Sequence, residues 1–179
     1  PSSDAILVGW LLCQCFWRAG ISRRVLQFFP AAGRGAANQL IQHRGVDAVI
    51  LTGGTATAWS MVKARPDLRL FAETGGKNAT VITALSDREL AIKHVVQSAF
   101  GHSGQKCSAT SLLLLEAEVY DDAHFKQTLG DAVKSLAVGS AWDLETKAGP
   151  LIRPPTVDLE TALKTLEPGE SWAVLPQRF

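Results

Sequence analysis

Three short segments of the sequence carry residue types that could do chemistry, and the first surrounds a cysteine. Cys107 lies in the polar sequence Gly-Gln-Lys-Cys-Ser-Ala at residues 104–109, directly after Lys106. A loop cysteine beside a cation is well placed to react as a thiolate, whereas Cys13 and Cys15 lie among apolar residues, as structural cysteines do. Covalent catalysis by Cys107 is therefore one interpretation, and a bystander thiol is the other.

The second segment centres on a carboxylate. Glu73 follows the mostly apolar residues 68–72 and precedes Gly75 and Gly76. A carboxylate at the end of a strand lies where α/β proteins usually build their sites, although a surface glutamate has the same local sequence. His102 could be a base for Cys107, but the loop between the two residues defines no geometry, so this role is not favoured.

The third segment is Thr52-Gly53-Gly54-Thr55, between an apolar run and a helical pattern. Glycines at such a position let the backbone approach a phosphate closely, and the start of a helix supplies free N–H groups and a partial positive charge. A plain strand-to-helix turn is the alternative interpretation. The Gly-x-Gly-x-x-Gly fingerprint is absent, so the ordinary dinucleotide-binding turn is not supported.

Helices and strands are expected to alternate in the part of the chain that carries the glycine segment and leads up to Glu73. Apolar spacing indicates the helices, and β-branched or aromatic runs indicate the strands. The expected order is helix 4–18, strand 25–29, helix 36–43, strand 47–51, helix 56–64 and strand 68–71. Such alternation predicts a parallel sheet flanked by helices.

The pattern changes after Ala72, where we place a domain boundary. The expected elements are then a strand over 79–83, a helix over 87–100, a strand over 110–115 and one long helix over 120–136. Prolines make the remaining tail rich in turns. Glu73 would lie at the domain junction, and Cys107 on the loop after the next helix.

Composition excludes several function classes. The 179 residues are 46% hydrophobic and 20% charged, which is typical of a globular protein and not of a disordered one. A net charge of +1 gives no electrostatic reason to expect binding to nucleic acid or to an anionic membrane. The longest apolar run, residues 6–12, is too short to span a bilayer. Three cysteines fit no zinc spacing, so we expect no metal site, a reducing compartment and a cytoplasmic location.

Taken together and in order, the three segments resemble motifs of the aldehyde dehydrogenase superfamily. The matching sequences are Leu-Thr-Gly-Gly-Thr at residues 51–55, Glu-Thr-Gly-Gly-Lys-Asn at 73–78 and Gly-Gln-Lys-Cys-Ser-Ala at 104–109. Glu73 and Cys107 are 34 positions apart, which is similar to the interval in that family. Residues 101–109, 141–143 and 166–172 are most similar to the L-glutamate γ-semialdehyde (1-pyrroline-5-carboxylate) dehydrogenases, in particular those of bifunctional proline-utilisation proteins.

The resemblance implies an α/β, aldehyde-dehydrogenase-like fold, with part of a Rossmann-type NAD-binding domain at 1–72 and part of the catalytic domain at 73–179. It implies oxidation of an aldehyde to an acid, with Cys107 attacking the aldehyde and Glu73 activating the water that hydrolyses the thioester. It places Ser108 at the substrate's carboxylate. It also implies NAD as cofactor, held by Thr52, Gly53, Gly54, Thr55, Thr74 and Gly75.

Departures from the family pattern limit this expectation. Gly54 stands where the family usually has a serine, so a hydroxyl that could meet phosphate is missing. The family's oxyanion-hole asparagine would precede Pro1, and the loss of one such donor costs on the order of 10²–10³ in rate. We therefore expect an internal fragment that is inactive alone. The parent protein would be a homo-oligomer, possibly fused to a proline dehydrogenase domain.

Two further functions stay open at this stage. One is oxidation of another small aldehyde, and the other is a non-catalytic binding module that kept the fold. The presence of both Cys107 and Glu73 speaks against the second. An acylating dehydrogenase that passes its thioester to coenzyme A is disfavoured, because Glu73 is present to activate water.

Overall fold

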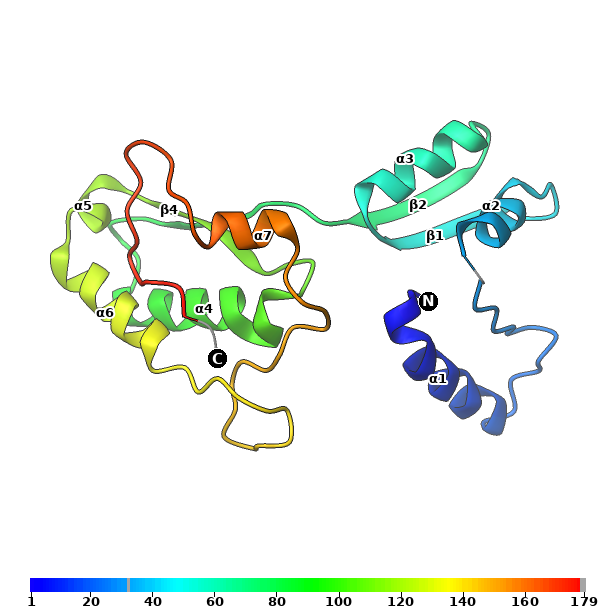
Figure 1. Cartoon of the computed structure of the whole chain (residues 1–179), viewed down its shortest axis with the longest axis horizontal. Coiled ribbons are helices and arrows are strands. Elements are labelled where there is room, and N and C mark those ends of the chain that lie inside the picture. The colour runs from blue at the N-terminus through cyan, green and yellow to red at the C-terminus, as the bar shows by residue number, and fades with distance from the viewer. Residues whose placement is uncertain (32, 178–179) are drawn as a thin grey trace. The chain divides into compact units, whose positions relative to one another are not determined.

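The computed structural model describes residues 1–31 and 33–177 (Figure 1). The chain divides into two compact units, Pro1–Thr74 and Gly75–Phe179. Each unit contains one pair of parallel strands. The break between the units falls beside the boundary expected near Ala72. The assignment of the two units to cofactor binding and to catalysis stays a prediction.

The first unit begins with a short 3₁₀ turn, Ser3–Ala5, and helix α1, Ile6–Arg18. The indole N–H of Trp17 donates a hydrogen bond of 3.0 Å to the carbonyl of Leu26, nine residues away. The Trp10 ring contacts the rings of Trp17 and Phe28, with centroids 5.4 and 5.6 Å apart. The segment after α1 therefore folds back on the helix through aromatic contacts.

The strand expected over residues 25–29 is wrong. The N–H groups of Val25 and Leu26 both donate to the carbonyl of Ser22, so the backbone turns here instead of extending. β-Branched and aromatic residues favour a strand only where a neighbouring strand can pair with them. Here the aromatic side chains pack against a helix.

A strand–helix–strand unit completes this part of the chain. Strand β1, Ala48–Gly53, leads through helix α3, Thr55–Ala64, to strand β2, Arg69–Thr74. The two strands are parallel, so the parallel sheet predicted from the alternating pattern is confirmed. Helix α3 contacts both strands and also helix α2, Arg34–Gln42.

Arg65, at the end of α3, ties these elements together. Its Nη1 donates to the carbonyls of Ile41, His43 and Val46, at 3.3, 3.2 and 2.7 Å. These carbonyls lie at the end of α2 and in the turn that enters β1. A single guanidinium thus satisfies several backbone acceptors and fixes the entry into β1.

The second unit is built on another parallel pair. Strand β3, Asn78–Ile82, pairs with strand β4, Thr110–Leu115, and the two are joined by helix α4, Arg88–Phe100. The remaining helices are α5, Ala117–Tyr120, α6, Ala123–Lys134, and α7, Val157–Ala162. Apolar side chains from β3, α4, α5 and α6 form the core, which consists of Ile82, Ile92, Val95, Val96, Val119 and Phe125.

The helix expected over 120–136 is confirmed with shorter bounds, because helix α6 covers Ala123–Lys134 and the separate short helix α5 ends at Tyr120. Oδ1 of Asp122 accepts hydrogen bonds from the N–H groups of His124 and Phe125, at 2.9 and 3.1 Å. An aspartate that caps two free N–H groups starts a new helix at that point. The chain therefore leaves α5 at Tyr120 and begins α6 at Ala123.

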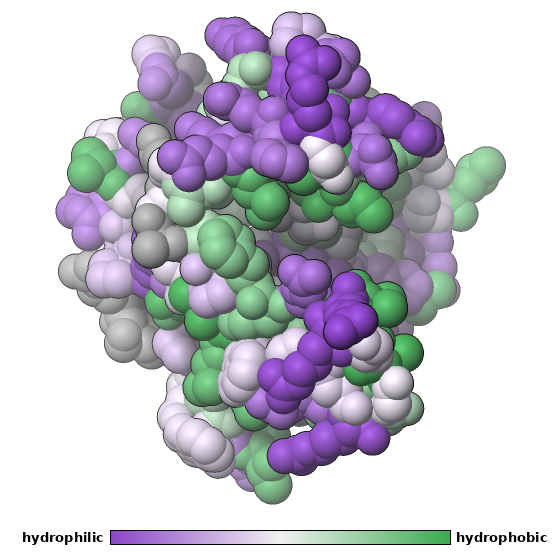
Figure 2. Space-filling view, turned by 90° about the vertical axis from the view of Figure 1, so that its right-hand side faces the viewer, coloured by the Kyte–Doolittle hydropathy of each residue, from purple (hydrophilic) through white to green (hydrophobic). Residues whose placement is uncertain are grey.

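Apolar side chains are distributed unevenly between core and surface. Figure 2 shows hydrophobic side chains open to solvent among polar ones on the face it presents. In the first unit, Ile50 and Phe71 lie opposite each other on the paired strands and are 83% and 57% accessible. One face of this sheet is therefore uncovered by the described residues. None of the helices formed by residues 1–31 and 33–177 is both long and apolar enough to cross a membrane.

Candidate functional site

The glycine segment and Glu73 lie at the same edge of the first sheet. In the parallel register, Thr52 is opposite Glu73 and Gly53 is opposite Thr74. Both strands end here, so their carboxyl ends meet at one edge, as in other parallel α/β sheets. Of the residues expected to bind the cofactor, the structure thus places Thr52, Gly53 and Thr74 beside one another.

Helix α3 begins directly at this edge. Gly54 is its N-cap residue, and no side chain caps the helix there. Gly53, Gly54 and Thr55 are all exposed, and a Cβ built on Gly54 would meet only the Thr57 hydroxyl, at 3.9 Å. Uncapped N–H groups beside exposed glycines fit a phosphate-bearing cofactor, because the helix start attracts negative charge. The residues present are therefore compatible with the pyrophosphate of NAD.

Glu73 is exposed on β2. A carboxylate that serves as a base near neutral pH usually needs some removal from water. None of the residues that the structure describes buries Glu73, so it stays accessible to water.

The loop that carries Cys107 starts with an unusual backbone turn. Helix α4 ends at Phe100, and the following turn, Gly101–Gly104, contains His102 and Ser103 with φ angles of 52° and 57°. Gly104 also has a positive φ, of 69°. Three successive left-handed residues reverse the chain sharply. Ser103 secures this turn, since its Oγ donates a 2.6 Å hydrogen bond to the carbonyl of Gly149.

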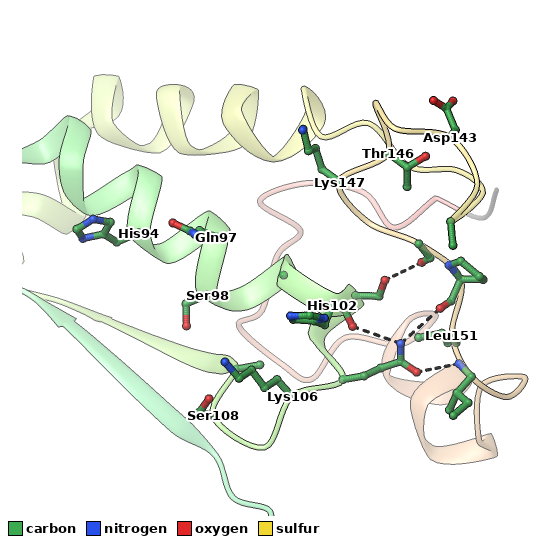
Figure 3. Close-up of a pocket in the computed structure, with 18 residues that line it drawn as sticks. His94, Gln97, Ser98, His102, Lys106, Ser108, Asp143, Thr146, Lys147 and Leu151 are labelled. Atoms are coloured by element: carbon green, nitrogen blue, oxygen red, sulfur yellow. Dashed lines mark hydrogen bonds between the residues drawn. The ribbon is translucent and has the colours of Figure 1, made fainter. Parts of the chain in front are cut away.

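Gln105 makes a second connection to the same distant segment (Figure 3). Its Oε1 accepts from the N–H of Ile152 at 2.8 Å, and its Nε2 donates to the carbonyl of Pro150 at 3.4 Å. Residues 101–109, which carry Cys107, are called the cysteine loop below. Ser103 and Gln105 therefore attach the start of this loop to residues 149–152. Gln105 belongs to the motif at residues 104–109, but its sequence position alone did not predict this role.

Asn78 holds the other end of the loop. Its Nδ2 donates to the carbonyls of Cys107 and Ala109, at 2.8 and 3.0 Å. Asn78 is the first residue of β3, and these acceptors immediately precede β4. Asn78 and Cys107 are far apart in the sequence, with most of β3 and the whole of α4 between them, so no local pattern predicted this contact. It depends on the pairing of β3 with β4, which was not predicted from the sequence.

Cys107 and Ser108 are both exposed, in a turn closed by a 3.0 Å hydrogen bond from the N–H of Ala109 to the carbonyl of Lys106. Beside this turn lies an open cavity of about 1130 Å³. Lys106 and Ser108 line it, whereas Cys107 is not among its lining residues. Figure 3 shows Lys106 and Ser108 together on the loop that carries them.

The cavity is lined mainly by polar and cationic side chains near the loop. Four of its lining residues carry or can carry a positive charge, and one is acidic; these are Lys106, Lys147, His94, His102 and Asp143. Such a lining suits an anionic group better than a neutral one. Among the described residues, no group of three or more His, Cys, Asp or Glu side chains could hold a metal ion.

The expected site residues thus fall into two groups. Thr52, Gly53, Gly54, Thr55, Glu73 and Thr74 belong to the first unit, and Gly75, Cys107 and Ser108 belong to the second. Thr52, Gly53, Glu73 and Thr74 lie at one strand edge of the first unit, and Cys107 and Ser108 lie in one turn of the second. That the two groups form one active site stays a prediction.

Comparison with known proteins gives consistent matches. Residues 1–169 match the model of the aldehyde dehydrogenase family. The mitochondrial delta-1-pyrroline-5-carboxylate dehydrogenase of Emericella nidulans is 33% identical over 162 residues, which cover 85% of this chain and 28% of the relative. The chain spans only about a third of the length of the curated relatives that it matches.

Two solved structures are similar in fold as well as in sequence. Proline Utilization A from Corynebacterium freiburgense is 38% identical with a TM-score of 0.93, and the match covers 100% of this chain and 18% of that one. The 1-pyrroline-5-carboxylate dehydrogenase from Thermus with bound NAD is 29% identical with a TM-score of 0.78, over 91% of this chain and 32% of that one. The family match extends over most of the chain and agrees with the expected motifs. The chain belongs to the aldehyde dehydrogenase family.

Proposed function

We propose that the protein containing this chain oxidises L-glutamate γ-semialdehyde to L-glutamate with NAD. The observation that carries the proposal is an exposed cysteine on a loop secured at both ends, at Asn78 and at Ser103 and Gln105. A nucleophile needs such fixed placement. The similarity to 1-pyrroline-5-carboxylate dehydrogenases and to Proline Utilization A supports this substrate over other aldehydes.

In the proposed reaction, the Cys107 thiolate adds to the aldehyde carbon and forms a thiohemiacetal. When bound, NAD would supply the hydride acceptor that oxidation of this adduct to a thioester requires. Glu73 takes a proton from water as the water attacks the thioester carbon, and the Cys107 thiolate leaves. Thr52, Gly53, Gly54, Thr55, Thr74 and Gly75 would hold the cofactor. Ser108 would donate a hydrogen bond to the carboxylate of the substrate.

The test uses the full-length protein that contains this chain, with NADH formation as the readout. Cys107→Ala should lower kcat for glutamate semialdehyde by on the order of 10³-fold or more, because no covalent adduct can form. Cys15→Ala is the matched control, since Cys15 is also an exposed, free thiol. Equal rates for these two variants would overturn the role of Cys107.

Glu73→Gln separates the two halves of the reaction. The first turnover should still release NADH in a burst, whereas the steady-state rate should fall by about 10²–10⁴-fold. Loss of the burst as well would show that Glu73 does not act at hydrolysis. A higher kcat/KM for another small aldehyde than for glutamate semialdehyde would contradict the proposed substrate.

The 179 residues alone should be inactive. Their length is about a third of that of the curated relatives, and the resemblance places further catalytic groups of the family outside them. The similarity to Proline Utilization A supports a proline dehydrogenase domain in the parent protein. Proline-dependent reduction of an added electron acceptor by the full-length protein would test that part of the proposal.

A further inference from the structure

Asn78 donates both hydrogens of its side-chain amide to the cysteine loop. A side-chain amide nitrogen carries two hydrogens, and Nδ2 of Asn78 makes two hydrogen bonds, one to the carbonyl of Cys107 and one to that of Ala109. The side chain is half-buried. The two acceptors lie on either side of Ser108, so the amide holds both ends of this short stretch.

The strand pairing explains why a side chain is needed at this point. The register between β3 and β4 shifts immediately after Asn78, which pairs with Thr110, whereas Ala79 pairs with Leu112. Such an irregularity interrupts the regular ladder of backbone hydrogen bonds. The carbonyls of Cys107 and Ala109 precede the paired stretch of β4, and the Asn78 amide serves as their donor.

The same contact restrains the turn that presents the thiol. Cys107 and Ser108 are the two central residues of the turn closed between Lys106 and Ala109. With the Cys107 carbonyl held by Asn78, its peptide plane cannot rotate freely, and the direction of the Cα–Cβ bond is fixed with it. A displacement of about 1 Å in a catalytic group can cost on the order of 10²-fold in rate.

We infer that Asn78 is a positioning residue for the Cys107 thiol. It acts through the backbone of the turn and touches neither substrate nor cofactor. Its effect on turnover rests on the proposed function, whereas its effect on the reactivity of Cys107 does not.

Thr80 offers a matched control on the same strand. Its hydroxyl shares a 2.8 Å hydrogen bond with the hydroxyl of Thr110, so it also links β3 to β4. Thr80 makes no hydrogen bond to the cysteine loop among those found in the described residues. Thr80→Val therefore removes a link between the strands and leaves both Asn78 contacts in place.

The experiment compares Asn78→Ala with Thr80→Val in the full-length protein. Asn78→Ala should lower kcat for the aldehyde by about 10–10²-fold with little change in KM, because binding contacts stay while the nucleophile is misplaced. Thr80→Val should leave both parameters near those of the wild type. Should Asn78→Ala fail to fold, Asn78→Leu removes the same donors while filling the same space.

A second readout does not depend on catalysis. Alkylation by iodoacetamide is followed at Cys107 and, as an internal reference, at Cys15 of the same molecule. The ratio of the two rates should differ severalfold between Asn78→Ala and the wild type, and Thr80→Val should keep the wild-type ratio. A wild-type ratio and a wild-type kcat in Asn78→Ala would overturn the inference. A wild-type protein without Cys107-dependent oxidation would instead overturn the proposed function, and the alkylation ratio would still test Asn78.

Discussion

At the scale of single residues, the backbone before Cys107 adopts a conformation that L-amino acids avoid. His102 and Ser103 are the non-glycine residues with positive φ among those described, and they are adjacent. Each such residue costs about 1–2 kcal/mol. The hydrogen bond from Ser103 to Gly149 offsets part of this cost. The strained residues directly precede the loop that carries Cys107, so the strain lies at the candidate site.

Gly104 completes this turn, and an alanine there should destabilise it. Its φ is +69°, and an added Cβ would lie 3.2 Å from the carbonyl oxygen of Ala99. We expect Gly104→Ala to lower the free energy of unfolding by about 1–2 kcal/mol, measured by urea denaturation. Gly101→Ala is the control, because Gly101 has a φ of −56° and an added Cβ would find open space. Equal losses in the two variants would contradict the strain argument.

At the scale of elements, capping decides where several helices begin. Asp87, Asp122 and Thr156 precede α4, α6 and α7, and each accepts a hydrogen bond from a free N–H group of the first turn. These caps set the register of the helices. The cap at Asp122 bears on packing, since α6 places Phe125 in the core of the second unit.

Removal of the Asp122 cap should weaken α6. We expect Asp122→Ala to lower the free energy of unfolding by about 1 kcal/mol, since two N–H groups lose their acceptor. Asp121→Ala, one residue earlier and exposed, removes the same charge and serves as the control. The experiment is a pair of urea titrations monitored by circular dichroism. A similar loss in Asp121→Ala would show that charge and not capping is responsible.

At the scale of the whole molecule, the two units differ in how much apolar surface they bury. Ile41 and Leu68 are the buried hydrophobic residues found in the first unit, whereas the second unit has a contiguous core of six. In the first unit Ile50, Trp59 and Phe71 are mostly exposed. Since apolar burial is the main stabilising contribution, the first unit should be the less stable one.

Hydrogen exchange of the 179-residue chain should reveal this difference. We expect the amides of β1 and β2 to exchange faster than those of β3 and β4, although β1 and β2 pair in a continuous register and the register of β3 and β4 shifts after Asn78. Mass spectrometry of the peptic fragments gives the protection of each strand. Equal protection of the two strand pairs would mean that the burial of apolar side chains does not determine the local stability of the two units.

Local pattern was sufficient to predict much of this protein. The parallel pair of the first unit, the helices α3 and α4, the family and the loop position of Cys107 follow from hydrophobic periodicity, glycine positions and motif spacing, which are properties of neighbouring residues. The strand expected over 25–29 failed because aromatic contacts with α1 outweighed local β propensity. The helix expected over 120–136 is present as α6 but begins only at Ala123, because Asp122 caps it.

The contacts that hold the candidate site were decided only by the tertiary structure. Asn78 reaches the carbonyl of Cys107 across 29 positions, Gln105 reaches Ile152 across 47, and Arg65 reaches Ile41 across 24. The residues next to such a side chain in the sequence do not indicate which distant backbone carbonyl it will contact. That contact is determined only when the elements of the fold come together. The sequence by itself determined which residues could do chemistry, and the fold decided which residues hold them in place.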